Sequence, residues 1–200
     1  MPETDNPVLE SEQRYRASAY ALLAALLREP PNQALLDHLA TLSPEDDSDL
    51  DDLGQAMAAL AVAGEGLDPG ALEQEYNDLF IGLGRGEVVP YGSWYLTGFL
   101  MEQPLSELRD DLRKLGFERN EAVKEPEDHA AAIFEVFSVM ISDAHSLAQQ
   151  LQFFNKHMRP WLERFFGDLG KARSADFYRR VAQFGEAFIR LESAYLSMRN

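Results

Sequence analysis

Cysteine is absent from the 200-residue sequence, which excludes disulfide bonds, thiolate metal sites and cysteine nucleophiles. Basic residues are scarce in the first half, where residues 1–100 carry 4 Lys and Arg against 18 Asp and Glu. The formal net charge of −16 repels nucleic acid phosphates and anionic membrane surfaces. We therefore expect no nucleic acid partner and a preference for cationic partners. The alternative that the acidity only keeps the protein soluble stays open.

Long hydrophobic runs are also absent. The longest, Ala19 to Leu27, is too short to span a bilayer. The first six residues contain no basic n-region and do not resemble a secretory signal. With 46% hydrophobic residues the chain can still form a sizeable core. We therefore expect a soluble, cytoplasmic protein of one domain without stable membrane insertion.

Apolar residues recur at helical spacing along most of the chain. Tyr15, Ala19, Leu22 and Leu26 form one such stripe, which ends before Pro30 and Pro31. No stretch alternates with the period of a strand. The predicted fold is a single all-α, bundle-like domain of roughly eight to ten helices. The expected helices cover residues 10–28, 33–42, 53–62, 69–80, 104–115, 126–146 with a break near 142–145, 148–158, 160–169 and 177–195.

Two further patterns complete the fold prediction. The run at residues 45–52 holds six acidic residues in eight positions and predicts a solvated loop. Aromatic residues and a seam in the last helix predict the core of the C-terminal half: Phe153, Phe154, Trp161, Phe165, Phe166, Phe177, Val181, Phe184, Phe188, Leu191 and Tyr195.

Residues 81–95 are rich in glycine and aromatic residues, and four glycines with Pro90 forbid a regular helix across the whole span. We expect a flexible, partly exposed loop whose aromatic side chains pack or bind a ligand. The segment Gly82 to Gly86 lacks the spacing and the preceding strand of a phosphate-binding loop. An aromatic surface of this kind beside an acidic field suits a peptide that is both apolar and basic.

The motif Glu125 to His129 begins the most apolar segment of the chain. Pro126 suits the first position of a helix, and Glu127 and Asp128 suit the positive end of its dipole. Since the following segment is apolar on nearly every side, we expect a buried central helix with Asp128 and His129 exposed on its first turn. Taken alone, the local pattern favours a structural role for His129, as a helix-terminal histidine bonded to a neighbouring carbonyl or carboxylate.

Catalytic and metal-binding patterns are weak. No histidine has a glutamate three residues before it, which a di-iron bundle requires, and there is no His-Glu-x-x-His motif. Asp128 and His129 are adjacent and would point about 100° apart on a helix. A small helical enzyme using this pair for acid–base chemistry and a purely structural bundle are the two alternatives to a binding protein.

The chain resembles the TorD/DmsD family of redox-enzyme maturation chaperones through two motifs. The first comprises Tyr76-x-x-Leu79-Phe80 followed by Pro90-Tyr91 with Ser93 and Tyr95. The second is Glu125-Pro-x-Asp128-His129. The downstream pattern Gln152-Phe153-Phe154-x-x-His157 with Trp161 is also similar, so the resemblance covers essentially the whole chain.

The resemblance implies a chaperone and not an enzyme. Its partner would be the apo form of a molybdopterin oxidoreductase of the dimethyl sulfoxide reductase type, together with the twin-arginine leader of that enzyme. The client would carry the molybdenum cofactor, and weak guanine nucleotide binding is implied without a site. The implied leader-binding residues are Tyr76, Leu79, Phe80, Pro90, Tyr91, Trp94, Asp128 and His129.

The resemblance also implies an organisation in two halves. Residues 1–116 and 126–200 would form the halves, and residues 117–125 the hinge between them. Because halves can be exchanged between protomers through such a hinge, both a monomer and a domain-swapped homodimer are expected.

Overall fold

The computed structural model describes residues 7–42, 51–82, 85–119 and 123–199. Across these ranges the protein is helical and contains no strand, only one isolated β-bridge, so the predicted all-α class is confirmed. None of the described helices is long and apolar enough to cross a membrane. The α-helices are α1 (Pro7–Arg28), α2 (Gln33–Ala40), α3 (Asp52–Gly64), α4 (Pro69–Tyr76), α5 (Gly92–Thr97), α6 (Gln103–Lys114), α7 (Ala130–Ser142), α8 (Leu147–Phe153), α9 (Leu162–Lys171) and α10 (Phe177–Met198), and the π-helical turns are η1 (Asn77–Ile81) and η2 (Phe154–Met158).

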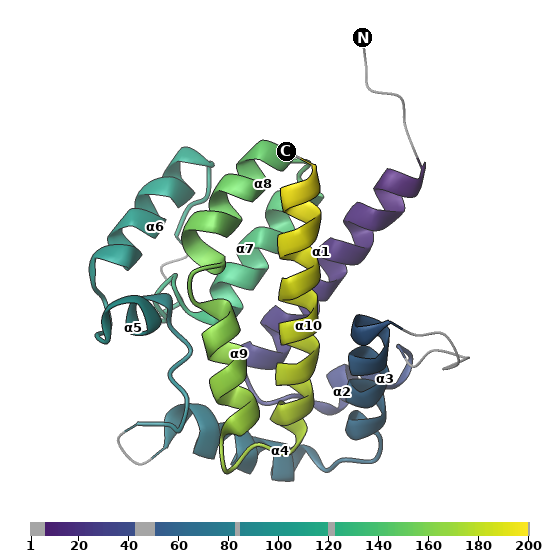
Figure 1. The fold of residues 1–200 in the computed structure, drawn as a ribbon. Helices are drawn as coiled ribbons and strands as arrows, with labels where there is room; N and C mark the ends of the chain where they lie inside the picture. Colours follow the sequence, from purple (N-terminus) through teal and green to yellow (C-terminus); the bar gives the residue numbers. More distant parts are fainter. Residues whose placement is uncertain (1–6, 43–50, 83–84, 120–122, 200) are drawn as a thin grey trace.

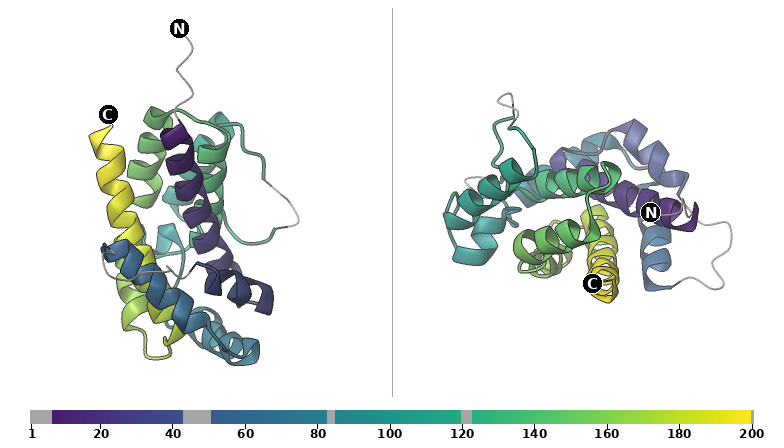
Figure 2. Two further views of the ribbon diagram at one scale, coloured as in Figure 1. Left: turned by 90° about the vertical axis from the view of Figure 1, so that its right-hand side faces the viewer. Right: turned by 90° about the horizontal axis from the view of Figure 1, so that it is seen from above.

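The core lies between two layers of helices (Figures 1 and 2). Helices α1 and α7 pack side by side, and α10 packs against α9 and α3. Tyr20 of α1 joins the layers, because its ring lies 4.8 Å from that of Phe137 in α7 and 4.7 Å from that of Phe188 in α10. Aromatic pairs at such distances add to the stabilisation from buried area.

The predicted core of the C-terminal half is confirmed with one exception. Phe153, Phe154, Trp161, Phe165 and Phe166 are all buried. In α10 the predicted seam residues are buried apart from Leu191, which is 45% exposed. Glu192 takes the inward position, with only 1% of its surface exposed, because its carboxylate pairs with Arg16 of α1.

The central helix begins later than predicted. Residues 126–129 form a turn closed by the bond from the His129 N–H to the Pro126 carbonyl (3.1 Å), and α7 starts at Ala130. Pro126 is therefore not in the first helical turn. Asp128 and His129 are also buried, 3% and 7% exposed, rather than exposed. The backbone pairing of residues 128–130 with residues 90–92, described below, competes with the helix at this point.

The C-terminal end of the predicted loop 81–95 is helical, since α5 begins at Gly92, and Ser93 and Tyr95 are buried. The Val88 N–H also donates to the Leu79 carbonyl (2.9 Å), which fixes the return of the chain after η1. Most of the acidic run at 45–52 lies outside the described residues. Asp51 is described and caps α3 by accepting a hydrogen bond from the Gly54 N–H (2.8 Å).

Candidate functional site

A short backbone bridge joins the two sequence motifs. The Gly92 N–H donates to the Asp128 carbonyl (2.8 Å), and the Ala130 N–H donates to the Pro90 carbonyl (2.8 Å). These bonds set Tyr91 opposite His129 in an antiparallel bridge. Residues of α5 and of the turn before α7 therefore form one unit. We call Tyr91, Ser93, Glu125, Asp128 and His129 the motif junction.

Asp128 fixes the start of α5. Its Oδ2 accepts hydrogen bonds from the Ser93 N–H (2.8 Å) and from the Ser93 hydroxyl. Its Oδ1 is buried and has no partner among the described residues. A buried carboxylate that receives charge-assisted bonds in this way positions a helix terminus firmly. Ser93 belongs to the first motif but was not predicted as a site residue, and its role became visible only through this contact.

His129 caps α7. Its Nδ1 accepts a hydrogen bond from the Ala131 N–H (3.1 Å), and its ring lies edge-on to the Tyr91 ring at 5.0 Å. Burial lowers the pKa of His129 to about 4, although the Glu125 carboxylate opposes this effect. The imidazole is therefore neutral at neutral pH, and its Nδ1 stays available as an acceptor.

Glu125 connects the junction to Tyr76. The Tyr91 hydroxyl donates to the Glu125 carboxylate. Burial and then Glu125 raise the pKa of Tyr76 to about 12. The Tyr76 hydroxyl itself donates to the Arg28 carbonyl at the end of α1 (2.9 Å). Tyr76, Pro90, Tyr91, Asp128 and His129 are thus brought into one neighbourhood, as the resemblance implied.

The remaining predicted residues lie outside the junction. Leu79 is fully buried in the core. Phe80 is half-buried and packs against Tyr178 of α10, with ring centroids 5.3 Å apart. Trp94 is half-buried beneath the Arg85 guanidinium, which lies 4.8 Å from the ring centroid. The structure therefore divides the predicted set into four groups: the junction residues Tyr91, Asp128 and His129, their neighbours Tyr76 and Pro90, the core residue Leu79, and the partly exposed rings of Phe80 and Trp94.

The arrangement is suited to positioning and binding. Asp128 and His129 bond to different partners, Ser93 and Ala131, so they do not form an acid–base dyad. Within the described ranges no three His, Asp or Glu side chains are grouped closely enough to hold a metal ion. Fold and junction together define the class: an all-helical protein in which a polar junction joins two sequence motifs.

Comparisons with known proteins identify the family. The family model described as nitrate reductase delta subunit matches residues 43–167, and the chain belongs to this family. The chaperone protein TorD of Vibrio atlanticus is 25% identical, with 91% of this chain and 94% of that protein aligned. TorD of Shewanella piezotolerans is 25% identical, with 98% and 96% aligned. TorD of Vibrio parahaemolyticus is 29% identical, but the chain spans only 64% of its length.

These relatives confirm the predicted membership of the TorD family and the prediction of a chaperone rather than an enzyme. Among solved structures, a redox enzyme maturation protein from Archaeoglobus fulgidus superposes with a TM-score of 0.54. The alignment covers 87% of this chain and 92% of that one at 18% identity. At this identity the likeness concerns the fold.

Proposed function

We propose that the protein is a cytoplasmic chaperone for the apo form of a molybdopterin oxidoreductase. It binds the twin-arginine leader of its client and delays export until the molybdenum cofactor has been inserted. The observation that carries this proposal is the motif junction, because the bridge between Tyr91 and His129 unites the two motifs that the family resemblance marks as leader-binding. The curated relatives named TorD support the chaperone class.

The charge of the chain supports a cationic partner. A net charge of −16 attracts a leader with two adjacent arginines over long range, and salt screens this attraction. In this proposal the cofactor belongs to the client and the chaperone holds none of its own. Weak guanine nucleotide binding remains an expectation from the resemblance, and no residue is assigned to it.

The connection between the halves is compatible with two oligomeric states. Helix α6 contacts the C-terminal half through Asp111, whose carboxylate accepts hydrogen bonds from Lys114 (2.7 Å) in α6 and from Lys156 (2.6 Å) in η2. The same contact can form within one chain or between two chains that exchange halves through residues 117–125. Monomer and domain-swapped dimer both remain compatible with the proposed function.

Calorimetric titration with synthetic leaders tests the proposal. Leaders from enzymes acting on trimethylamine N-oxide, dimethyl sulfoxide, nitrate and formate are compared at low salt. We expect one leader to bind, to bind more weakly after salt is added, and to lose about tenfold in affinity to Tyr91→Ala. Circular dichroism confirms that the variant is folded. Failure of every leader to bind at low salt overturns the proposal.

A further inference from the structure

The connection between α5 and α6 exposes a cluster of large apolar side chains. Leu96, Phe99, Leu100 and Met101 are all exposed, Phe99 by 68% and Met101 by 72%. Together they form a patch on the order of 500 Å², a size at which exposed apolar surface is often an interaction site. We call these four residues the α5–α6 projection, because this connection forms the left-hand edge of the molecule in Figure 1.

The backbone holds the projection outward. The Gly98 N–H donates to the Trp94 carbonyl (2.8 Å) and ends α5 with a left-handed φ of 84°. The Thr97 hydroxyl accepts a hydrogen bond from the Phe99 N–H (3.2 Å). Met101 also has a left-handed φ, 59°, which is strained in a residue with a side chain. The apolar side chains are therefore exposed by a defined turn.

One face of α7 is also open to solvent. Although the α7 sequence is apolar on nearly every side, Glu135 and Val139 are exposed and Ala132 and Val136 are only half-buried. These four positions follow one another at helical spacing and form a stripe. The prediction of a helix buried all round is therefore wrong for this face.

A groove runs along this stripe. It has a volume of about 920 Å³ and lies between α6, the connection after α6 and the open face of α7. We call it the α7 groove. Its apolar lining includes Leu112, Phe117, Val123, Val136 and Val139, of which Val123 and Val139 are exposed. The groove is thus a concave apolar surface, and the projection is a convex one.

Both surfaces are neutral in an acidic protein. The 14 residues from Val88 to Met101 include no charged side chain and form the longest such stretch in the chain. The charges that line the groove cancel, since they are four arginines and four glutamates: Arg28, Arg109, Arg113, Arg119, Glu118, Glu125, Glu127 and Glu135. Because each chain has a net charge of −16, two copies repel each other least where both facing surfaces are neutral.

The areas favour two contacts at once. One projection seated in one groove buries on the order of 1,000 Å² over both copies, below the roughly 1,200–2,000 Å² of a stable interface. Both surfaces adjoin α6, a helix of only 12 residues, so one copy can present both of them to a single partner. In a two-fold arrangement the buried area doubles to about 2,000 Å².

We propose that a second copy of this chain binds through the α5–α6 projection and the α7 groove. In this two-fold dimer each projection lies in the groove of the other copy, where Phe99 and Met101 contact Val136 and Val139. The halves of each chain stay in place, so the dimer differs from a domain-swapped one. Because the two acidic copies repel each other, salt strengthens this dimer, whereas salt weakens the binding of a cationic leader.

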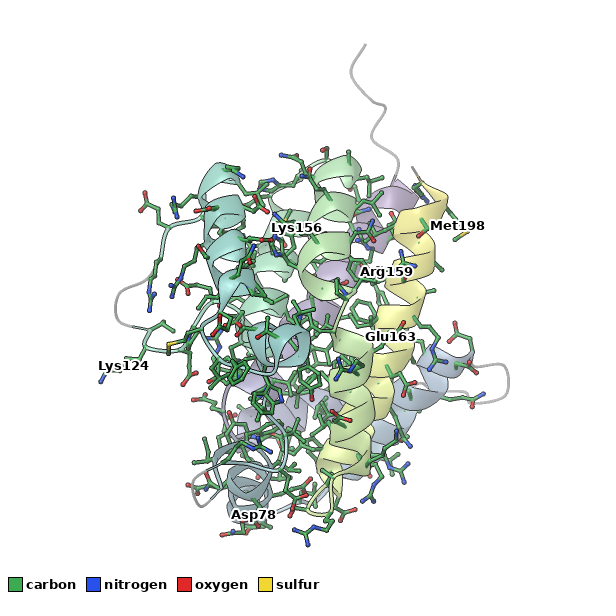
Figure 3. All side chains as sticks on the ribbon, turned by 60° about the vertical axis from the view of Figure 1, so that its left-hand side comes forward. Asp78, Lys124, Lys156, Arg159, Glu163 and Met198 are labelled. Carbon is green, nitrogen blue, oxygen red and sulfur yellow. The ribbon has the colours of Figure 1, made fainter. Side chains whose placement is uncertain are left out.

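Sedimentation velocity at low and high salt tests the projection. We expect the wild-type chain to dimerise more tightly at high salt. Met101→Lys should weaken the dimer about tenfold or more, because each dimer contains two projections and a lysine is costly to bury. Met198→Lys is the matched control, since Met198 is 77% exposed and Figure 3 shows it on the opposite side of the molecule from Lys124 in the connection after α6.

A second variant tests the groove. Val139→Glu places a carboxylate in the apolar lining and should also weaken the dimer about tenfold or more. Val62→Glu is the matched control, because Val62 is 59% exposed on α3 and does not line the groove. Thermal melting confirms that all four variants fold.

Mixing the two interface variants tests whether the projection and the groove meet. A mixed dimer of Met101→Lys with Val139→Glu keeps one unchanged contact, and in the other contact the new lysine faces the new glutamate. We therefore expect the mixture to associate more tightly than either variant alone. A mixture of the two control variants should behave like the wild-type chain.

Three outcomes overturn the proposal. The first is a wild-type chain that stays monomeric at high salt. The second is a dimer that the interface variants form as tightly as their controls, because its interface then lies elsewhere, as in a domain-swapped dimer. The third is a mixture that associates no more tightly than the two variants alone. None of these outcomes depends on whether a leader binds.

Discussion

Two buried polar centres of the molecule differ in how completely their groups are paired. In the first, Arg16 donates from Nε and Nη2 to the two carboxylate oxygens of Glu192, at 2.8 Å each, and from Nη1 to Gln150 (2.9 Å). Tyr20 also donates to Glu192 (3.0 Å). In the second, the motif junction, one oxygen of Asp128 has no described partner and Tyr91 bonds to the exposed Glu125. The first centre is fully paired and fixes helices to one another, whereas the second is paired only in part.

The position of each centre explains this difference. The Arg16 centre lies among α1, α8 and α10, and Arg16 and Glu192 are 3% and 1% exposed. A buried charge pair stabilises a fold only when all of its hydrogen bonds are made. The junction lies at the starts of α5 and α7, and its Glu125 is exposed, so water can replace the Tyr91 hydroxyl at that carboxylate. A mutation in the first centre should therefore cost stability, and one in the second should cost less stability and more binding.

The largest effect is expected from Glu192→Ala. Removing this carboxylate leaves the Arg16 guanidinium buried without its counter-charge, and we expect a loss of about 3–5 kcal/mol in the free energy of unfolding. Urea denaturation followed by circular dichroism measures it. The control replaces both members, as Arg16→Met/Glu192→Leu, and should recover most of the loss. A loss below about 1 kcal/mol in Glu192→Ala would contradict the assigned role.

The motif junction should make stability depend on pH. Because the pKa of His129 is lowered from 6.5 to about 4, the unfolded chain binds more protons than the folded chain between these values. The contribution is complete above pH 6.5 and decreases as the pH falls toward 4, by on the order of 3 kcal/mol. Burial also lowers the pKa of His157, which acts in the same direction. Urea titrations across this range measure the slope.

His129→Asn provides the test of that slope. Asparagine can still accept the Ala131 N–H as a helix cap, but it does not titrate. We expect the variant to be less sensitive to pH between 6.5 and 4 than the wild type. The remaining slope comes from His157 and, toward pH 4, from the carboxylates of Asp111 and Glu127, whose pKa values are also lowered. An unchanged slope would show that His129 does not contribute.

The comparison also shows what the sequence could reveal. Apolar periodicity was sufficient for most of the helices and most of the core, because burial of large side chains dominates those choices. It did not predict the short helix α5, which lies in a segment rich in glycine. Leu191 was misplaced because the α10 seam turns so that Glu192 faces Arg16, and a pairing between residues so distant in sequence leaves no local signal. The Arg16 centre was missed for the same reason.

The sequence predicted which residues make up the candidate site, but not how those residues are arranged. The two motifs named the residues, and the backbone bridge does bring Tyr91 and His129 together. The helix start at Pro126 and the exposure of Asp128 were wrong, because tertiary hydrogen bonds to residues 90–93 override a good local N-terminal signal. The leader-binding role of these residues stays a prediction.

The smallest expected effects come from removing one tyrosine hydroxyl in each of the two centres and comparing the losses of stability. Tyr20→Phe removes a hydroxyl that donates to a fully buried carboxylate, and it should cost about 1–3 kcal/mol. Tyr91→Phe removes a hydroxyl that donates to the exposed Glu125, where water can replace it, and it should cost about 0.5 kcal/mol or less. Both variants keep their rings, so packing against Phe137 and His129 is retained.

Urea denaturation compares the stability of the two variants, and leader titration compares their affinity. Equal losses of stability would remove the distinction between a centre that holds the fold and one that faces a ligand, whereas a loss of affinity only in Tyr91→Phe would establish it.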